Sequence, residues 1–313
     1  MTEMRSIVYH TLVVATGSRY RNNMPWKEAE TTAQTLANVA KLRGEIEKAR
    51  SIVVAGAGLT GVEFAAELGL AYGKSGRKKI TLVGTEEDLP LTPQVKTSVR
   101  ETARRQLAKL GVSYVGGVKA TTRPAPPVAA AAGGDNSMNG GDKKMAVAQA
   151  QTVTLTKSNG ETRTMTADLV VPAYGVIPNT FFVPDRLRND TTGGHMRQLP
   201  DLRTPGYDNV FVLGDVGDLQ PARAAHADAQ VRHLIKQFTA YFAGRPMKPY
   251  VFDANRLQMA LSLSRDYGTG QAGSWQIWGY LVWYLKSRHL GTDQAAAYAR
   301  GKVGLGRPWP NNY

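Results

Sequence analysis

The sequence predicts an α/β protein with a parallel sheet. One stretch, residues 51–68, combines a β-branched run at Ile52, Val53 and Val54 with a glycine-rich turn and a helix of apolar periodicity. A second short apolar run follows at residues 80–83. Strands of a parallel sheet are buried on both faces, so they read as nearly continuous apolar runs. The two runs and the helix between them therefore predict a strand–helix–strand unit.

The turn inside this unit reads Gly56-Ala57-Gly58-Leu59-Thr60-Gly61, which has the GxGxxG spacing of a dinucleotide-binding turn. Gly56 permits the tight turn, Gly58 lets a pyrophosphate approach the backbone, and Gly61 lets the helix pack against the strand. Thr60 lies at the helix N-terminus, where amide groups face the phosphates. A purely structural glycine-rich turn is the alternative, and the flanking strand and helix favour binding.

Composition narrows the chemistry. The 313 residues contain no cysteine, which excludes disulfides, thiolate metal sites and a redox-active dithiol. The five histidines show no ligand-like spacing, so no metal site is predicted. Redox chemistry then needs a bound organic cofactor. A net charge of +14 favours anionic partners, or simply a solvated basic surface, and no nucleic-acid module is recognisable.

The remaining pattern alternates strands and helices. Apolar runs and turn signals predict strands at 6–17, 112–115, 152–156, 162–165, 168–174, 209–215 and 257–263, helices at 36–46, 95–110 and 222–242, and an aromatic helix or strand–helix unit at 275–290. A turn at 158–160 joins two of these strands into a hairpin. The stretch Thr121 to Ala150 is rich in Ala, Gly, Pro, Asn and Lys, and we expect a disordered insert there.

The choice between NADH and NADPH stays open in the sequence. A site for NAD usually has an acid at the end of its second strand, where it binds the ribose hydroxyls. Gly84 occupies that place here, and Glu86 can serve if the register is shifted by two. The basic run 77–79 precedes the same strand, and it suggests either NADPH or a solvated loop.

Four motifs in order resemble a known family. They are Ala15-Thr16-Gly17 after a strand, the GxGxxG turn followed by Glu63, the Gly-x-x-Pro-Asn segment at 175–179, and a strand ending in Gly214-Asp215. This order resembles the two-dinucleotide-binding flavoprotein oxidoreductases. The segments 264–271 and 285–290 resemble the branch of apoptosis-inducing-factor-like and ferroptosis-suppressor proteins.

The resemblance implies two Rossmann-like domains, one for FAD and one for NAD(P)H, and a small C-terminal α+β domain. It implies an NAD(P)H:quinone-type reductase that passes a hydride from nicotinamide to flavin and on to a quinone-like acceptor. Thr16, Gly17 and Asp215 match residues that bind FAD, and Glu63 and Lys286 match a catalytic pair near the flavin ring.

Each of these residues also has a structural explanation. Glu63 can be an acid favoured by the helix macrodipole, Lys286 a cation near the end of an apolar helix, and Asp215 a turn residue after a strand. Without the resemblance, neither Glu63 nor Lys286 stands out.

The chain also departs from the family. No FAD fingerprint precedes Met1, so we expect residues 1–20 to be a remnant of the FAD domain, 21–180 the NAD(P)H domain, 181–245 the continued FAD domain, and 246–313 the C-terminal domain. As a fragment, a mis-started gene product or a natural short form, the chain is expected to bind NAD(P)H better than FAD. A catalytically impaired, nucleotide-binding and cell-death-related interaction protein is therefore the alternative function.

The aromatic segment 275–290 suggests peripheral membrane contact, because Trp and Tyr favour the headgroup layer. Packing of these rings inside the protein is the alternative. No signal peptide or membrane-spanning run is recognisable, so we expect a cytoplasmic or mitochondrial protein. The expected partner is a small quinone-like molecule, and nucleic acid is not expected.

Overall fold

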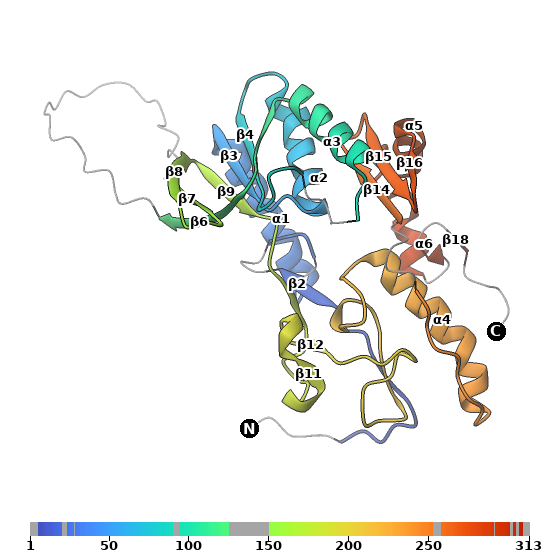
Figure 1. Cartoon of the computed structure of the whole chain (residues 1–313). Helices are drawn as coiled ribbons and strands as arrows, with labels where there is room; N and C mark the ends of the chain where they lie inside the picture. Colours follow the sequence, from blue (N-terminus) through green and yellow to red (C-terminus); the bar gives the residue numbers. More distant parts are fainter. Residues whose placement is uncertain are drawn as a thin grey trace, which may run out of the picture. The chain divides into compact units, whose positions relative to one another are not determined.

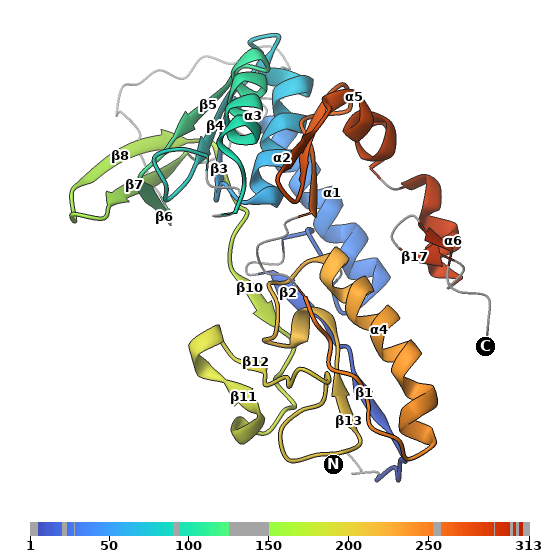
Figure 2. The same cartoon turned by 45° about the vertical axis from the view of Figure 1, so that its right-hand side comes forward.

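The computed structural model describes residues 6–20, 24–27, 29–89, 94–124, 150–252, 258–290, 292–300, 303–304 and 307–308. The chain divides into two compact units. Unit 1 comprises Met1–Ala29, Gly175–Ala254 and Gly291–Tyr313, and unit 2 comprises Glu30–Tyr174 and Asn255–Leu290. Both units mix helices and strands, as Figures 1 and 2 show. The predicted α/β fold class is confirmed.

Unit 2 is built on a four-stranded parallel sheet with the order β5-β4-β3-β9. Its strands are β3 (Ser51–Ala55), β4 (Lys79–Val83), β5 (Val112–Val115) and β9 (Leu169–Pro172). The strand order places the first strand centrally, as in a dinucleotide-binding half. Helix α2 (Leu59–Leu68) and a π-helical turn (Gly69–Gly73) connect β3 to β4, which confirms the predicted strand–helix–strand unit.

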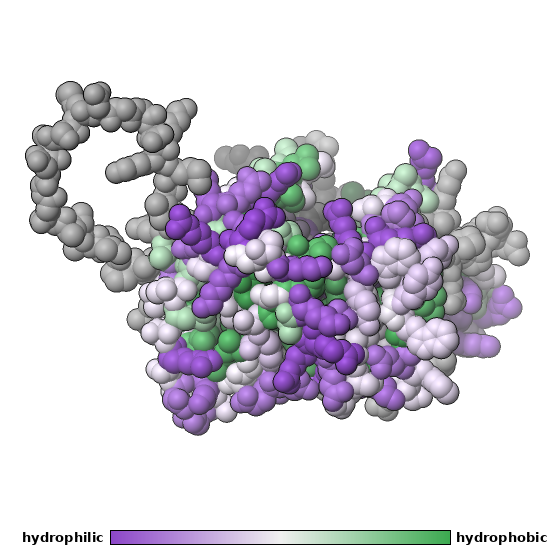
Figure 3. All heavy atoms as spheres, turned by 90° about the horizontal axis from the view of Figure 1, so that it is seen from above, coloured by the Kyte–Doolittle hydropathy of each residue, from purple (hydrophilic) through white to green (hydrophobic). Residues whose placement is uncertain are grey.

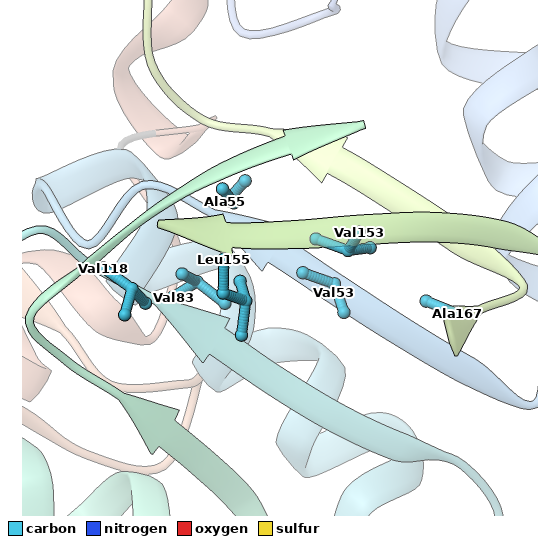
Figure 4. Close-up of a cluster of buried hydrophobic side chains, with 8 residues drawn as sticks. Val53, Ala55, Val83, Val118, Val153, Leu155 and Ala167 are labelled. Atoms are coloured by element: carbon cyan, nitrogen blue, oxygen red, sulfur yellow. The ribbon is translucent and has the colours of Figure 1, made fainter. Parts of the chain in front are cut away.

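The sheet is covered on both faces, which explains its continuous apolar strands. Val53, Ala55 and Val83 point to one face and form a buried cluster with Val153 and Leu155 of an antiparallel meander (Figure 4). Each fully buried Val or Leu contributes about 1.5–3 kcal/mol. Alternate residues point to the opposite face, where α2 contacts β3 and β4, and α3 (Thr97–Lys109) contacts β5.

The meander consists of β6 (Val118–Pro124), β7 (Gln151–Lys157) and β8 (Thr162–Ala167). The predicted hairpin between the last two strands is confirmed. The expected insert at 121–150 needs a correction at its start, because Thr121 to Pro124 continue β6 by pairing with β7. Pairing with a neighbouring strand supplies the order that the local composition lacks. Residues 125–149, where disorder is expected, lie outside the described residues.

Asp168 ties the starts of two sheet strands together. Its Oδ2 accepts hydrogen bonds from the amides of Arg50 and Ser51, both at 2.8 Å, and from the Ser51 hydroxyl at 3.1 Å. Burial raises the pKa of this carboxyl, but the bonds from the Ser51 and Arg50 amides outweigh it, so the pKa lies below its ordinary value. The carboxylate form is therefore the one that the fold stabilises.

Asp168→Ala is expected to destabilise the chain by about 1–3 kcal/mol, because two strand-start amides lose their acceptor. A folded pKa below the unfolded one adds stability above the unfolded pKa, and that stability is lost as the pH falls. The difference between wild type and variant in urea unfolding is therefore expected to be full at neutral pH and smaller below the ordinary aspartate pKa. A difference that stays constant down to that pH would contradict the assignment.

The rest of unit 2 is an N-terminal helix and a small C-terminal sheet. Helix α1 (Thr32–Lys48) begins at Thr31, whose side chain accepts a hydrogen bond from the amide of Gln34. The sheet consists of the antiparallel strands β14 (Gln258–Ser262), β15 (Gly268–Ala272) and β16 (Trp275–Ile277). Helix α5 (Gly279–Val282) and a π-helical turn (Trp283–Ser287) follow, so the strand–helix alternative predicted for 275–290 is confirmed.

Unit 1 contains short strands and one long helix. Strand β1 (Leu12–Val14) pairs in parallel with β13 (Val210–Val212), and β2 (Ser18–Tyr20) pairs with β10 (Val176–Pro178). The other elements are β11 (Arg188–Asn189), β12 (His195–Met196), α4 (Ala224–Phe242), α6 (Ala295–Ala299), β17 (Val303–Gly304), β18 (Arg307–Pro308) and 3₁₀ turns at Asp185–Leu187, Asp190–Thr192, Gly214–Val216 and Thr292–Gln294.

The strand predicted at 6–17 is wrong in its first half. Only Leu12–Val14 form a strand, and Val8 is 99% exposed. β1 exists where β13 offers a partner, and the apolar residues before it have none among the described strands. The predicted domain boundaries stay a prediction, while the boundaries between the two compact units fall after residues 29, 174, 254 and 290.

Candidate functional site

The glycine turn after β3 has the geometry that each glycine requires. Gly56 has a φ of +111°, a region that strongly favours glycine, and its amide donates to the Val83 carbonyl of β4 at 2.8 Å. A Cβ placed on Gly61 would lie 1.8 Å from the Gly56 carbonyl oxygen. The start of α2 thus packs directly on the turn, as predicted from the sequence.

Gly58 faces open space, unlike Gly56 and Gly61. No atom lies within 4 Å of a Cβ placed there. Gly58 is also the N-cap of α2, so the first amides of the helix follow it, and Thr60 is the second helical residue. An open backbone at a helix N-terminus fits a pyrophosphate, which is large and anionic. The residues present therefore fit the phosphates of a nicotinamide dinucleotide, and their role in binding stays a prediction.

The end of β4 explains why a glycine stands where an acid is usual. A Cβ on Gly84 would lie 2.5 Å from the Tyr114 Oη and 2.8 Å from the Ala57 Cβ. The Tyr114 hydroxyl donates to the Glu86 carbonyl at 2.7 Å, so the phenol ring occupies the space and holds the following loop. Burial, together with the carboxylates of residues 86–88, raises the pKa of Tyr114 to about 12.

The acidic residues that follow β4 lie at the same edge of the sheet as the nucleotide turn. Glu86 and Glu87 are exposed, and the Glu87 side chain lies against Gly117. The basic run 77–79, by contrast, leads into the start of β4, at the opposite edge of the sheet. There Lys78 Nζ donates to the Glu47 carbonyl at 3.0 Å, and Arg77 binds the Ala71 carbonyl. These cations cap backbone carbonyls and lie away from the turn.

Glu63 and Lys286 form an ion pair although 223 positions separate them. Lys286 Nζ lies 2.5 Å from Glu63 Oε1 and also donates to the Ala260 carbonyl at 2.9 Å. The same carboxylate oxygen accepts the Ser262 amide at 2.9 Å. Glu63 sits on the first turns of α2, and Lys286 on the π-helical turn, so the C-terminal sheet is joined to the nucleotide-turn helix. Their side chains are 29% and 36% exposed, which leaves both accessible.

Glu67 is a further acid on this helix that the sequence reasoning missed. It lies four residues after Glu63, and its Oε1 is buried without a hydrogen-bond partner among the described residues. Burial raises the pKa of the Glu67 carboxyl, the Arg265 cation opposes the rise, and Asp266 and Glu63 add to it. The i, i+4 spacing of two acids on one helix face is the signal that would have found it.

The residues predicted for FAD come together in unit 1. The Thr16 hydroxyl donates to the backbone carbonyl of Asn179 at 3.0 Å, and the backbone amide of Asn179 donates to the Gly17 carbonyl at 3.0 Å. Gly17 has a φ of +66°, and a Cβ there would meet nothing within 4 Å. The Ala-Thr-Gly turn is therefore tied to the Gly-x-x-Pro-Asn segment, two motifs that are far apart in the sequence.

Asp215 is bound to the same turn. The Ser18 hydroxyl donates to Asp215 Oδ2 at 3.0 Å, and Lys27 Nζ pairs with the same oxygen and donates to the Ser18 hydroxyl at 2.6 Å. Asp215 stands in the 3₁₀ turn after β13. No motif in the sequence pointed to Lys27. These contacts fit a polar, hydroxyl-bearing ligand portion such as the ribityl chain of FAD, and that role stays a prediction.

The predicted site residues therefore form two groups. Gly56, Gly58, Thr60, Gly61, Glu63, Glu86 and Lys286 belong to unit 2, and Thr16, Gly17 and Asp215 belong to unit 1. The sheet order and the glycine turn define an α/β protein with a Rossmann-like fold. Residues 2–230 match the pyridine nucleotide-disulphide oxidoreductase family, and the chain belongs to that family.

Curated relatives agree with this family. The chain is 31% identical to oxidoreductase ptaL of Pestalotiopsis fici over 88% of its length and 66% of the relative. It is 27% identical to ferroptosis suppressor protein 1 of Taeniopygia guttata, over 93% of its length and 71% of the relative. The chain thus spans about two thirds of the length of these relatives.

Solved structures share the fold. The ferredoxin reductase for the CYP199A2 system from Rhodopseudomonas palustris aligns with a TM-score of 0.55 at 20% identity, over 84% of this chain and 58% of that chain. The predicted resemblance to the apoptosis-inducing-factor-like and ferroptosis-suppressor branch is confirmed. Although the family name refers to disulphides, these 313 residues contain no cysteine.

Proposed function

We propose that this chain acts as an NAD(P)H-dependent flavoprotein oxidoreductase with a quinone-like acceptor. The observation that carries the proposal is the Glu63–Lys286 pair, in which Glu63 lies on the helix that begins at the nucleotide turn. That pair occupies the two positions that the sequence resemblance assigns to the reacting centre. Family membership supports oxidoreductase chemistry. The quinone-like nature of the acceptor is what we propose in addition.

The two residues have complementary tasks. A bound flavin would supply two-electron chemistry between nicotinamide and acceptor. Lys286 can donate a proton from Nζ or offset negative charge as it develops on the acceptor. Glu63 and the Ala260 carbonyl fix the position of the ammonium group, since both accept from it. Gly56, Gly58 and Gly61 would hold the nicotinamide dinucleotide by its pyrophosphate.

The test is oxidation of NADH by the purified chain with added FAD and a soluble quinone. We expect oxidation that depends on both the quinone and the flavin. Flavin absorbance after gel filtration measures retained FAD independently of turnover. A chain that retains FAD and binds NADH but does not reduce the quinone would overturn the proposed acceptor.

One observation favours the alternative, an interaction protein that binds nucleotide with little turnover. The nucleotide turn of unit 2 is fully formed, whereas the parallel sheet of unit 1 has two strands, β1 and β13, among the described residues. The alternative predicts NADH binding without stoichiometric FAD and without quinone-dependent oxidation. The same experiment therefore separates the two functions.

For the hydride donor, we propose a preference for NADH over NADPH. Residues 86–88 are three successive acids at the carboxyl edge of the sheet, where the adenine ribose of a dinucleotide binds. A 2′-phosphate would meet their negative charge, whereas the run 77–79 lies at the opposite edge. The positive charge of Arg104 is already balanced by the Asp88 carboxylate, which lies 3.8 Å away.

Dissociation constants for NADH and NADPH, measured by nucleotide fluorescence, test this preference. We expect NADH to bind about tenfold more tightly or better, and Glu86→Lys to narrow the gap because it reverses an exposed charge at this edge. Glu161→Gln, an exposed acid in the β7–β8 turn, is the matched control and should leave the ratio unchanged. Equal binding of both nucleotides by the wild type would overturn the preference.

A further inference from the structure

One surface of unit 2 exposes large aromatic and apolar side chains close together in the sequence. We define the aromatic surface as Trp275, Trp278, Tyr280, Leu281, Tyr284 and Leu285, all of which are exposed. Trp275, Trp278 and Tyr280 are 79%, 83% and 74% exposed, and Leu285 is 68% exposed. Single exposed apolar residues are ordinary, but six exposed within eleven positions make this segment a candidate interaction surface.

The local fold turns these side chains outward. Val282 and Ser287 point inward and are fully buried. Val282 packs so closely on Gly268 that a Cβ on this glycine would lie 2.5 Å from the Val282 side chain. Two glycines of β15 thus let α5 and the π-helical turn approach the sheet closely. Because small residues fill the inner side, the large rings remain on the outer side. Trp283 is fixed between the two, since its indole Nε1 donates to the Arg265 carbonyl at 2.9 Å.

The charge of this segment is of one sign. Residues 267–292 contain Lys286 and Arg288 but no Asp or Glu, and the charge of Lys286 is balanced by its ion pair with Glu63, so Arg288 is the cation that accompanies the surface. The Arg288 guanidinium lies 3.9 Å from the centroid of the Tyr284 ring, so a cation accompanies the exposed rings. The whole chain carries a net charge of +14. A partner that fits must accept aromatic rings and carry negative charge.

We propose that the aromatic surface binds the headgroup layer of an anionic lipid bilayer. Trp and Tyr combine an apolar ring with a polar group, and they concentrate at the membrane–water interface. An arginine next to them, here Arg288, is attracted to anionic headgroups. On the hydropathy scale of Figure 3, such rings are pale, and large pale side chains lie among hydrophilic ones on the face shown. None of the described helices is both long and apolar enough to cross a membrane.

The surface adjoins the candidate reacting centre. The π-helical turn Trp283–Ser287 carries Lys286, which pairs with Glu63, and also Tyr284 and Leu285 of the aromatic surface. A membrane-bound orientation would therefore bring lipid close to the Glu63–Lys286 pair, where a lipid-soluble acceptor could reach it. This link rests on the proposed function, whereas lipid binding does not.

The test is flotation of the full chain with vesicles of phosphatidylcholine, with and without phosphatidylserine. We expect the chain to float with the anionic vesicles. Trp278→Ser should weaken this binding about tenfold, because one aromatic side chain that the bilayer would bury is lost. Arg288→Gln is expected to weaken it about fivefold, on the anionic vesicles only. Phe181→Ser in unit 1 is the matched control, because Phe181 is also 83% exposed.

Three results would overturn the proposal. The first is no flotation with anionic vesicles, and the second is an equal loss of binding in the Trp278 and Phe181 variants. The third is a dimer, measured by light scattering, that Trp278→Ser dissociates, since the surface would then be a contact between two copies. Circular dichroism checks that each variant is folded. Flotation requires neither flavin nor turnover, so its failure is distinguishable from failure of the proposed reductase.

Discussion

Gly61→Ala is expected to abolish nicotinamide nucleotide binding and to destabilise unit 2 severely. The new Cβ would lie 1.8 Å from the Gly56 carbonyl oxygen and 3.2 Å from the Ala173 Cβ. The first contact is with backbone, which cannot rotate away as a flexible side chain can. The start of α2 must therefore move off the sheet, at a cost of about 3 kcal/mol or more, which is a large share of the stability of a domain.

Gly58→Ala is expected to separate binding from folding at the same turn. Nothing lies within 4 Å of a Cβ on Gly58, and its φ of −72° is allowed for alanine. Thermal unfolding should change little. The added methyl group would stand where the pyrophosphate approaches the backbone, so NADH binding should weaken by a factor of ten or more. Unchanged NADH binding by the folded Gly58→Ala variant would show that the turn does not hold the nucleotide.

Gly44→Ala supplies the control for both variants. Gly44 lies inside α1, and a Cβ there also meets nothing within 4 Å. Alanine in a helix interior is more stable than glycine by about 0.5–1 kcal/mol, so this variant should unfold later and bind NADH as the wild type does. The measurements are thermal unfolding and NADH fluorescence titration for all three variants. A purely structural turn would give parallel changes in stability and binding.

The nucleotide turn could be predicted from sequence because its determinants are local. A strand, three glycines and a helix follow one another within residues 51–68, and each glycine acts on neighbours a few positions away. The same holds for the β7–β8 hairpin. Local patterns failed where pairing decides the structure: Ile7 and Val8 have strand-forming side chains but lie outside β1, and Thr121 to Pro124 have a disorder-prone composition but pair with β7.

Contacts between distant segments were beyond the sequence. Lys27 reaches Asp215 across 188 positions, and nothing around Lys27 distinguishes it from other surface lysines. Tyr114 explains the glycine at position 84, yet Gly84 follows β4 and Tyr114 belongs to the neighbouring strand β5. The Glu63–Lys286 pair was predicted only through family resemblance. The structure adds its physical basis, which is the packing of the C-terminal sheet on α2.

Lys286→Met is expected to reduce flavin-dependent NADH:quinone turnover by about 10²–10⁴-fold, the range for loss of a positioned proton donor. NADH binding should remain within about twofold of wild type, since the glycine turn holds the nucleotide. Folding should be nearly unaffected, because a pair with 36% and 29% exposed side chains contributes less than about 1 kcal/mol. Arg288→Met, on the next residue but one, is the matched control with normal turnover of a soluble quinone.

The double variant Glu63→Gln, Lys286→Met distinguishes a catalytic pair from one cation and one anion that act independently. Glu63→Gln removes the charge but keeps an oxygen for the Ser262 amide, so the C-terminal sheet should stay attached to α2. If Glu63 acts by positioning Lys286, its loss should matter little once Lys286 is already methionine, and the two effects should be far from additive. Additive losses would mean that the residues act separately. A Lys286→Met variant that turns over normally with FAD bound would remove Lys286 from the reaction and leave the pair as a structural link between α2 and the C-terminal sheet.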